Sequence, residues 1–312
     1  MNERDTARQP LVSVVIPAYN HGKYLDAAIR SILEQDYPRV ELIVIDDGST
    51  DNTREVLTKY EGRFHFESQP NMGQVATLNK GWLMSHGEIL AYLSADDLLL
   101  QGAIRSAVRC LEENADAVLT YCDFNLIDPR SAFMRRVTTP EFDYREMLTK
   151  LLCPPGPGAF FTRSAFEKAG LWDASFRQML DYEYWLRLGL CGRFIRMPLV
   201  LAAFRVHADS LTFTTSSPDE PIKIIENFFK RTDISEEIKT LRNQALGNAY
   251  LVSAQLHFRA DAYRLGVGAL RNAFSLYPKN FFTLAMLRRT ANVLFNRIGH
   301  KVLWKINSLL RK

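Results

Sequence analysis

Short apolar runs rich in Val, Ile and Leu recur along the first part of the chain and stop at polar residues or proline. The clearest are Leu11–Ile16, Val40–Ile45 and Ile89–Leu93, and weaker runs cover Arg63–Glu67 and Ala117–Tyr121. Uninterrupted runs of this length are typical of strands that are buried on both faces. We therefore predict a strand at each of these places.

Between these runs, the apolar residues are spaced as on one face of a helix. This spacing predicts helices at Tyr24–Gln35, Asp51–Tyr60, Gly73–Ser85 and Ala103–Glu113. Strands and helices that alternate in this order form a doubly wound, mostly parallel sheet with helices on both faces. The sequence therefore predicts an α/β fold.

Polar side chains gather directly after three of the predicted strands. Asn20 follows the first strand, Asp46 and Asp47 follow the second, and Asp96 and Asp97 follow Ile89–Leu93. In open α/β sheets, ligands bind beyond the carboxyl ends of the strands. Each polar group alone could simply cap a turn or a helix, but their recurrence at strand ends favours a binding site.

The pattern loosens after Asp123 and changes again near residue 216. The Pro154–Gly158 stretch is predicted to be a shaped loop, Phe166–Trp172 and Asp181–Leu190 helices, and Met197–Val206 a strand. Beyond residue 216 the sequence is helical in character. We therefore predict a catalytic domain at residues 1–215 and a helical C-terminal region at residues 216–312.

The chemistry of the strand ends rests on carboxylates, because neither GxxxxGK[ST] nor GxGxxG follows the first strand. Adjacent acids such as Asp96 and Asp97 would repel an anionic ligand unless a divalent cation lay between them. Mg²⁺ and Mn²⁺ prefer oxygen ligands, commonly one or two carboxylates together with phosphates of a substrate. The pair therefore suggests a metal that holds a diphosphate, with a helix cap as the alternative.

Composition excludes several classes of protein. The four cysteines form no CxxC pair, which argues against zinc-ribbon and thioredoxin-like sites. The N-terminus lacks an apolar signal-peptide core, and no uncharged apolar run approaches the roughly 18 residues of a membrane span. A net charge of +4 is too small to indicate a nucleic-acid-binding protein. We expect a cytoplasmic protein.

Several motifs in sequence order resemble the family 2 glycosyltransferases. They are Val14–Asn20 (VVIPAYN), Asp46–Asp51 (DDGSTD), Asn71-x-Gly73 with Asn79-x-Gly81, and Gly87–Asp97 (GEILAYLSADD). The resemblance implies the GT-A fold and a site for a nucleotide-diphosphate sugar, UDP-sugar above all. It also implies Mn²⁺ or Mg²⁺ as the metal and a saccharide or lipid-linked saccharide as the acceptor.

The resemblance assigns roles to residues at the strand ends. Asp47 would hydrogen-bond the nucleotide base, with Asp46 supporting the turn, and Asp96 would contact the ribose or the sugar. The remaining nucleotide-sugar contacts would come from Pro17, Ala18 and Tyr19 at the base and from Asn79 and Lys80 at the ribose or diphosphate.

The same resemblance implies the metal ligands. Asp97 would ligate the metal, and His207, within Arg205-Val206-His207, would contact the metal or the diphosphate. Many members of the family carry Asp where this chain has Ser94, which leaves fewer carboxylates for the metal.

The general base of the family lies in an acidic motif at the start of a helix. Here Asp181 fits that position, and Glu183 is the alternative base. The implied reaction is a single displacement with inversion that moves one sugar at a time. Pro154–Gly158 and Phe160-Phe161 lie where the family often shapes its acceptor side, so we expect acceptor contacts there.

Positive charge is concentrated at the C-terminus. Residues 262–312 carry ten Arg and Lys and no Asp or Glu, whereas the rest of the chain carries 29 Arg and Lys against 35 acids. A basic amphipathic helix with Trp and Phe is typical of a peripheral membrane element. We expect this end to bind the inner face of the cytoplasmic membrane, with packing on the protein itself as the alternative.

Two other functions are compatible with parts of the sequence. A sugar nucleotidyltransferase would carry a glycine-rich signature where this chain has Ile16–Asn20. A non-catalytic sugar- or partner-binding protein on the same scaffold would not need acids at positions 47, 96, 97 and 181, and all four are present. Glycosyl transfer is therefore the favoured function.

Overall fold

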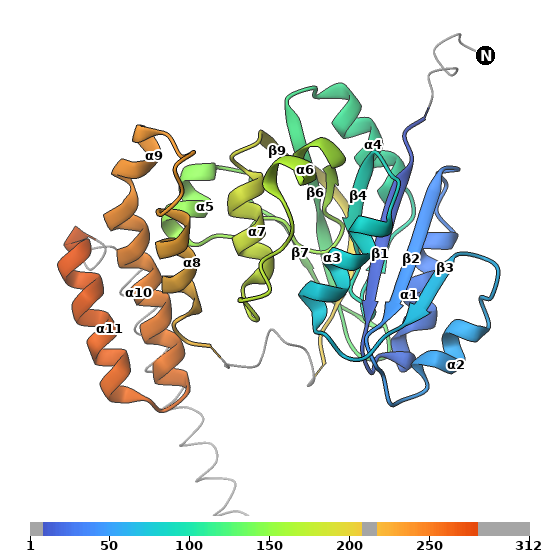
Figure 1. Ribbon diagram of the computed structural model, residues 1–312, viewed down its shortest axis with the longest axis horizontal. Helices are drawn as coiled ribbons and strands as arrows, with labels where there is room; N and C mark the ends of the chain where they lie inside the picture. Colours follow the sequence, from blue (N-terminus) through green and yellow to red (C-terminus); the bar gives the residue numbers. More distant parts are fainter. Residues whose placement is uncertain (1–8, 208–216, 280–312) are drawn as a thin grey trace, which may run out of the picture. The chain divides into compact units, whose positions relative to one another are not determined.

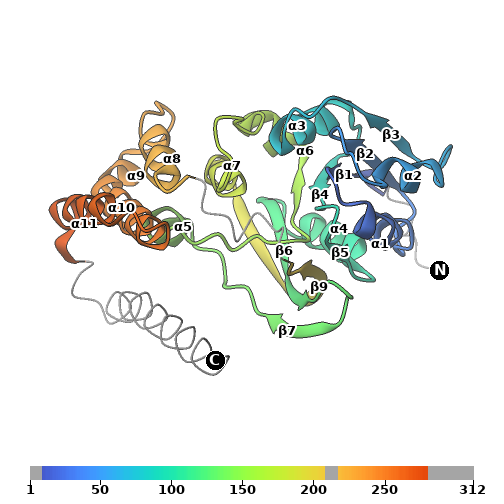
Figure 2. The ribbon, with the colours of Figure 1, turned by 90° about the horizontal axis from the view of Figure 1, so that it is seen from below.

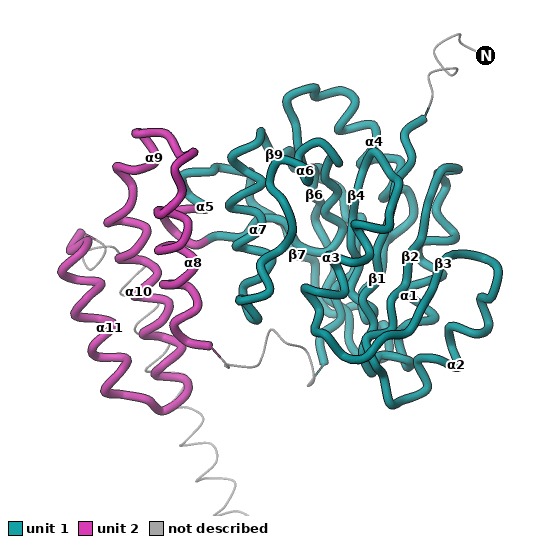
Figure 3. Tube along the Cα trace, viewed as in Figure 1, with its two compact units in different colours: residues 1–147, 152–214 teal, residues 148–151, 215–312 magenta. Residues whose placement is uncertain are grey.

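The structure is a computed structural model, in which residues 9–207 and 217–279 are described. The chain divides into two compact units, residues 1–147 with 152–214 and residues 148–151 with 215–312 (Figure 3). All described strands belong to the first unit, and the second is helical throughout its described part.

One half of the sheet is parallel and matches the predicted strands closely. Its order is β3-β2-β1-β4, with β1 in register with both neighbours through Val12. The bounds of these strands are β1 Val12–Ala18, β2 Val40–Asp46, β3 His65–Ser68 and β4 Ile89–Tyr92. Because the strands are parallel, their carboxyl ends lie at one edge of the sheet (Figure 1).

The other half of the sheet mixes strand directions. The short strand β8 (Phe160–Thr162) runs antiparallel between β4 and β6 (Ala117–Ile127), and β6 is parallel to β9 (Arg193–Arg205). β5 (Leu98–Leu99) and β7 (Phe133–Val137) add antiparallel pairings to β9 and β6. The predicted α/β class is confirmed.

Helices cover both faces of the sheet, as predicted (Figure 2). α1 (Gly22–Leu33), α2 (Thr53–Thr58) and α4 (Ala103–Glu113) share one apolar core with alternate residues of β1 and β2. The opposite face carries α3 (Gln74–Met84), α6 (Arg163–Ala169) and α7 (Leu180–Leu188).

Aromatic rings fill the space between the sheet and this second set of helices. Trp82 of α3 contacts the rings of Phe161, Trp172 and Tyr184, and all four side chains are buried. The expectation that Phe160 and Phe161 contact the acceptor is wrong. Both lie in the centre of the sheet with at most 1% exposure, because Phe160 packs into the apolar core on one face and Phe161 against Trp82 and Trp185 on the other.

The segment after β6 is more regular than the sequence indicated. It contains β7 and α5 (Tyr144–Lys150), where no element was predicted. β7 is an exposed strand that pairs with β6. Its sequence therefore lacks the alternation of apolar and polar residues by which a half-buried strand is recognised.

The described part of the second unit consists of four helices. They are α8 (Glu220–Phe228), α9 (Glu236–Thr240), α10 (Arg242–Arg259) and α11 (Tyr263–Leu276). Asp219 joins the start of α8 to α10 by accepting hydrogen bonds from Ser253 at 2.7 Å and His257 at 2.8 Å. α10 and α11 approach closely at Gly266, where a Cβ would lie 2.6 Å from the Phe258 ring.

No helix within residues 9–207 and 217–279 is both long enough and apolar enough to cross a membrane. Most of the predicted membrane-binding end, residues 280–312, lies outside the described residues.

A buried ionic cluster holds β6, β7 and β9 together. Asp123 of β6 has no exposed surface and receives hydrogen bonds from Arg136 of β7, at 2.7 Å, and Arg196 of β9, at 2.8 Å. Burial alone would raise the pKa of Asp123, but the two guanidinium groups and Thr139 outweigh burial and lower it to about 2. The Asp123 carboxylate is therefore charged in the folded protein at neutral pH.

We predict that Asp123→Ala lowers the free energy of unfolding by about 3 kcal/mol or more, because it leaves the Arg196 charge without its buried partner. The lowered pKa means that the wild type gains stability above about pH 4 and loses about 2 kcal/mol of it as the pH falls towards 2. Urea unfolding at several pH values should show this loss in the wild type and a smaller one in the variant.

Asp116 provides the matched control. It lies just before β6 and pairs with Arg193 of β9, but its side chain is 62% exposed to solvent. Asp116→Ala should change stability by less than about 1 kcal/mol. Equal losses in the two variants would contradict a structural role for the buried cluster.

Candidate functional site

The pairing of β5 with β9 assembles the candidate site. Leu98 lies opposite Ala203 in antiparallel register, so the turn before β5 lies beside the residues that follow Ala203. Asp96, at the end of the β4 segment, therefore meets His207, although the two residues are 111 positions apart in the sequence.

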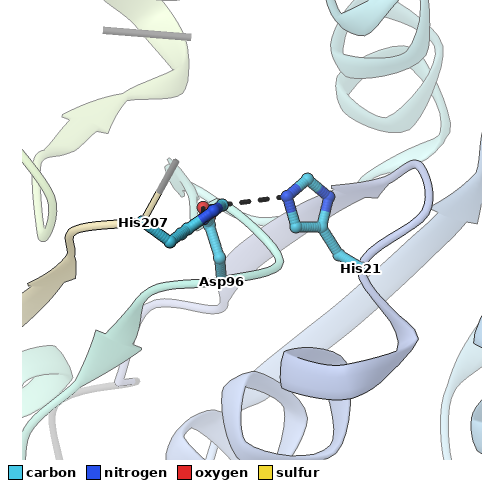
Figure 4. Close-up of side chains that lie close together, drawn as sticks. All are labelled: His21, Asp96 and His207. Carbon is cyan, nitrogen blue, oxygen red and sulfur yellow. Dashed lines mark hydrogen bonds and ion pairs between the residues drawn. The ribbon is translucent and has the colours of Figure 1, made fainter. Parts of the chain in front are cut away.

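Three side chains converge at this point (Figure 4). The Oδ2 atom of Asp96 lies 2.8 Å from Nε2 of His207 and 3.8 Å from Nε2 of His21. His21 comes from the loop between β1 and α1, and His207 follows β9. The His207 side chain is 6% exposed, whereas that of His21 is 30% exposed and open to a ligand.

The donor set of this cluster suits a divalent cation. One carboxylate oxygen and two imidazole nitrogens lie within 4.8 Å of one another. Neighbouring ligands of an ion bound at about 2.1 Å are separated by about 3 Å, and the two measured separations from Asp96 bracket that value. His21, Asp96 and His207 could therefore hold a metal ion.

Asp97, the predicted metal ligand, is not one of the three residues of this cluster and is bonded to the β9 backbone. Its side chain is buried, and its Oδ1 atom accepts a hydrogen bond from the backbone N–H of Arg205 at 2.9 Å. Burial, together with the neighbouring charge of Asp96, raises the pKa of Asp97 well above its usual range. Of the two adjacent acids, Asp96 is the one that lies in the cluster with His21 and His207, and ligation of a metal by Asp97 stays a prediction.

Arg205 holds the turn that carries both acids. Its guanidinium group is 1% exposed and donates hydrogen bonds to the backbone carbonyls of Asp96, at 2.8 Å, and Asp128, at 3.0 Å. The group also lies 4.7 Å from the centre of the Tyr24 ring, which contacts the ring of His207. Arg205 thus fixes the backbone of Asp96 and packs beside His207.

Asp47, predicted to bind the base, organises the loop before α3. Its carboxylate accepts hydrogen bonds from the backbone N–H groups of Met72 and Gly73, both at 2.8 Å, and from the Gln69 side chain at 2.9 Å. Gly73 adopts a φ of 86°, which favours glycine. The carboxylate therefore fixes this loop, whatever else it contacts.

Asp46 and Lys80 are also held by neighbouring groups. Asp46 accepts hydrogen bonds from the backbone N–H of Ser49 and the hydroxyl of Ser68, each at 3.0 Å. Lys80 pairs with Glu67 and donates to Gln69, the residue that also binds Asp47. Gln69 therefore links Lys80 to Asp47, the acid that is predicted to bind the nucleotide base.

Asn79 makes two hydrogen bonds to one residue. Its Nδ2 atom donates to the carbonyl of Trp172, and its Oδ1 atom accepts from the N–H of Trp172, each at 2.9 Å. The structure thus shows Asn79 attaching the segment before α7 to α3. A contact between Asn79 and the ribose or diphosphate stays a prediction.

The predicted base-binding turn offers mainly one side chain to solvent. Tyr19 is 45% exposed, Pro17 is half-buried, and Ala18 is fully buried. The carbonyl of Ala18 accepts a hydrogen bond from the N–H of Asp47. Among the three residues, Tyr19 is the one that presents an open ring surface.

Asp181 and Glu183 have different environments. Glu183 accepts hydrogen bonds from Arg187 at 2.6 and 2.8 Å, so its carboxylate is engaged along α7. Asp181, in the first turn of α7, accepts a hydrogen bond from the N–H of Tyr182, and burial raises its pKa. Burial and then the charge of Asp181 raise the pKa of Tyr92 at the end of β4.

The comparison with known protein families decides the identity of the fold. The profile of glycosyl transferase family 2 matches residues 13–173, which is more than half of the chain. The chain belongs to this family. An uncharacterized glycosyltransferase of Rickettsia prowazekii (strain Madrid E) is 30% identical over 266 residues, covering 79% of this chain and 83% of that protein.

Solved structures agree with this family 2 assignment. Staphylococcus aureus TarS, residues 1–349 in complex with UDP-GlcNAc, matches with a TM-score of 0.63 at 16% identity and covers 86% of this chain and 92% of that one. The mannosyltransferase PcManGT from Pyrobaculum calidifontis, in complex with GDP-Man and Mn²⁺, has a TM-score of 0.61 at 18% identity, covering 96% and 88%. The predicted GT-A fold is confirmed.

No sequence motif selects His21 or Gln69 of this family 2 protein. His21 lies 75 positions before Asp96, and no motif spacing links the two. Gln69 lies next to no other polar site residue in sequence, yet it joins Lys80 to Asp47. Only the presence of a side chain directly after a strand end could have drawn attention to either residue.

We predict that Asn79→Asp lowers the free energy of unfolding by about 1–3 kcal/mol, because it replaces the N–H donor that faces the Trp172 carbonyl by an oxygen. Thermal unfolding would measure the loss. Asn52→Asp is the control, since Asn52 is exposed and makes no side-chain cap hydrogen bond. A loss in the control as large as that in Asn79→Asp would contradict the assignment.

Proposed function

We propose that this family 2 protein is an inverting, metal-dependent glycosyltransferase that moves one sugar from a nucleotide-diphosphate sugar to an acceptor hydroxyl. The observation that carries the proposal is the meeting of Asp96, His207 and His21 beyond the carboxyl ends of the strands. As the catalytic domain we propose residues 1–215.

As donor we propose a UDP-sugar, with a GDP-sugar as the alternative. Support comes from TarS, whose structure is in complex with UDP-GlcNAc, and from PcManGT, whose structure is in complex with GDP-Man and Mn²⁺. The exposed ring of Tyr19 is suited to stack on the nucleotide base. Lys80 and Asn79 are proposed to lie near the ribose or diphosphate.

Asp96 and His207, with His21 beside them, would hold Mn²⁺ or Mg²⁺. A cation bound there supplies positive charge that neutralises the departing nucleoside diphosphate. The buried Arg205 supports this arrangement, because it fixes the backbone of Asp96 without using the carboxylate.

Asp181 is proposed as the general base. Its carboxylate takes the proton of the acceptor hydroxyl while the hydroxyl oxygen forms a bond to the anomeric carbon. The bond from that carbon to the phosphate oxygen breaks, and its electron pair leaves with the nucleoside diphosphate, so the configuration inverts. The raised pKa of Asp181 makes it a stronger base than an exposed aspartate, and the engagement of Glu183 with Arg187 favours Asp181 over Glu183.

The acceptor is proposed to be a saccharide or lipid-linked saccharide in bacterial surface polysaccharide or glycolipid synthesis. Support comes from residues 262–312, whose ten Arg and Lys and lack of acids suit the anionic inner face of the cytoplasmic membrane. The enzyme would then be cytoplasmic and peripheral to that membrane.

We expect Asp181→Asn to lower sugar transfer by about 10²–10⁴-fold, because the amide cannot accept the proton. The measurement is transfer from UDP- and GDP-sugars to a panel of saccharide acceptors with Mn²⁺, together with donor binding by calorimetry. Donor affinity should survive the substitution. Glu183→Gln is the matched control two residues further along α7, and a rate loss confined to Glu183→Gln would identify Glu183 as the base.

The rate should fall as the pH drops through the pKa of Asp181, since the base must be deprotonated. Burial raises this pKa, so the acidic limb of kcat/KM should lie above the pH of about 4 that an exposed aspartate would give. A profile that stays flat down to pH 4 would contradict Asp181 as the titrating base.

A further inference from the structure

His21 is held in place by both of its neighbours in the sequence. The N–H of Asn20 donates to the hydroxyl of Ser49 at 2.9 Å, and the N–H of Gly22 donates to Asp51 at 3.0 Å. Asn20 adopts a φ of 55°, a conformation that Asn tolerates better than most residues. The backbone on each side of His21 is therefore attached to the loop that follows β2.

Gly22 shows how closely this attachment is packed. A Cβ at position 22 would lie 2.3 Å from Oδ1 of Asn52 and 2.6 Å from the backbone nitrogen of Thr53. The backbone carbonyl of His21 also accepts hydrogen bonds from the N–H groups of Tyr24 and Leu25 in the first turn of α1. The loop thus presents the His21 imidazole from a fixed backbone, as preorganised metal ligands are presented.

The imidazole points towards Asp96 rather than away from it (Figure 4). Its Nε2 atom lies 3.8 Å from Oδ2 of Asp96. The centres of the His21 and His207 rings are 6.0 Å apart, and the rings meet edge to face. Both imidazoles therefore approach the same carboxylate oxygen, from β1 and from β9. A cation on that oxygen would have nitrogen donors on two sides.

We infer that His21 is a third protein ligand of the metal, and that the two imidazoles make the site prefer Mn²⁺ over Mg²⁺ more strongly than an all-oxygen site would. The inference rests on the proposed function, because it concerns the metal of that site. Imidazole nitrogen suits transition metals, whereas Mg²⁺ prefers oxygen ligands. Metal binding would also join the loop after β1 to the turn before β5.

The test uses the full-length protein with Mn²⁺, first alone and then with UDP. Pulsed electron paramagnetic resonance detects imidazole nitrogens bound directly to Mn²⁺, so the wild type should show two coordinated nitrogens and His21→Ala one. Mn²⁺ affinity, measured by calorimetry, should fall at least about tenfold in His21→Ala. Asp96→Asn should weaken binding further and serves as the positive control.

His86→Ala is the matched histidine control, because His86 is 80% exposed and pairs with Glu41 outside this cluster. It should keep two coordinated nitrogens and the affinity of the wild type. His21→Asp tests the preference itself: it should keep Mn²⁺ bound with one nitrogen and bring the affinities for Mn²⁺ and Mg²⁺ closer together. Thermal unfolding would confirm that each variant is folded.

Two results would overturn the inference. Two coordinated nitrogens in His21→Ala, or one in the wild type, would show that His21 does not bind the metal. If such a wild type still transfers sugar, the proposed function stands and this inference alone fails. If the wild type binds Mn²⁺ through two nitrogens but transfers sugar from no nucleotide donor, the inference stands and the proposed function fails.

Discussion

The contact between the end of β9 and the turn before β5 is the constraint on which the candidate site depends. Arg205 makes this contact with two hydrogen bonds. Its backbone N–H donates to the Asp97 carboxylate, and its guanidinium group donates to the Asp96 carbonyl. A buried guanidinium group is costly unless its donors are satisfied, and here the Asp128 carbonyl and the Ser131 hydroxyl also accept hydrogen bonds. The Asp96 carboxylate is thereby left to face His207.

Polar residues at the strand ends divide into two groups by what they contact. Asp47, after β2, bonds to backbone N–H groups and fixes the loop before α3. Asn79, within α3, bonds to the backbone of Trp172 and fixes the segment around it. Asp96 and His21 instead meet at side chains that are partly open to a ligand. The first group fixes the backbone around the candidate site, and the second forms the cluster that could hold a cation.

The sequence predicted the parallel half of the sheet well. β1, β2 and β4 are continuous apolar runs, which can be recognised without knowing what packs against them. The sequence missed β8, since three residues show no periodicity, and it predicted acceptor contacts for Phe160 and Phe161, which are buried against the two faces of the sheet. It also missed α5, a short helix in a segment for which it predicted no element.

Sequence alone determined the family, the strand ends where polar residues gather, and the identity of most side chains in the candidate site. The motif around Asp96 and Asp97 could not say which carboxylate meets His21 and His207, because the directions of adjacent side chains are set only once the chain is folded. The pairing of Leu98 with Ala203 decided this, turning Asp97 towards the β9 backbone and Asp96 towards His207. It was likewise the parallel sheet that brought His21 to Asp96, because side chains separated by 75 residues meet only where strand ends share one edge.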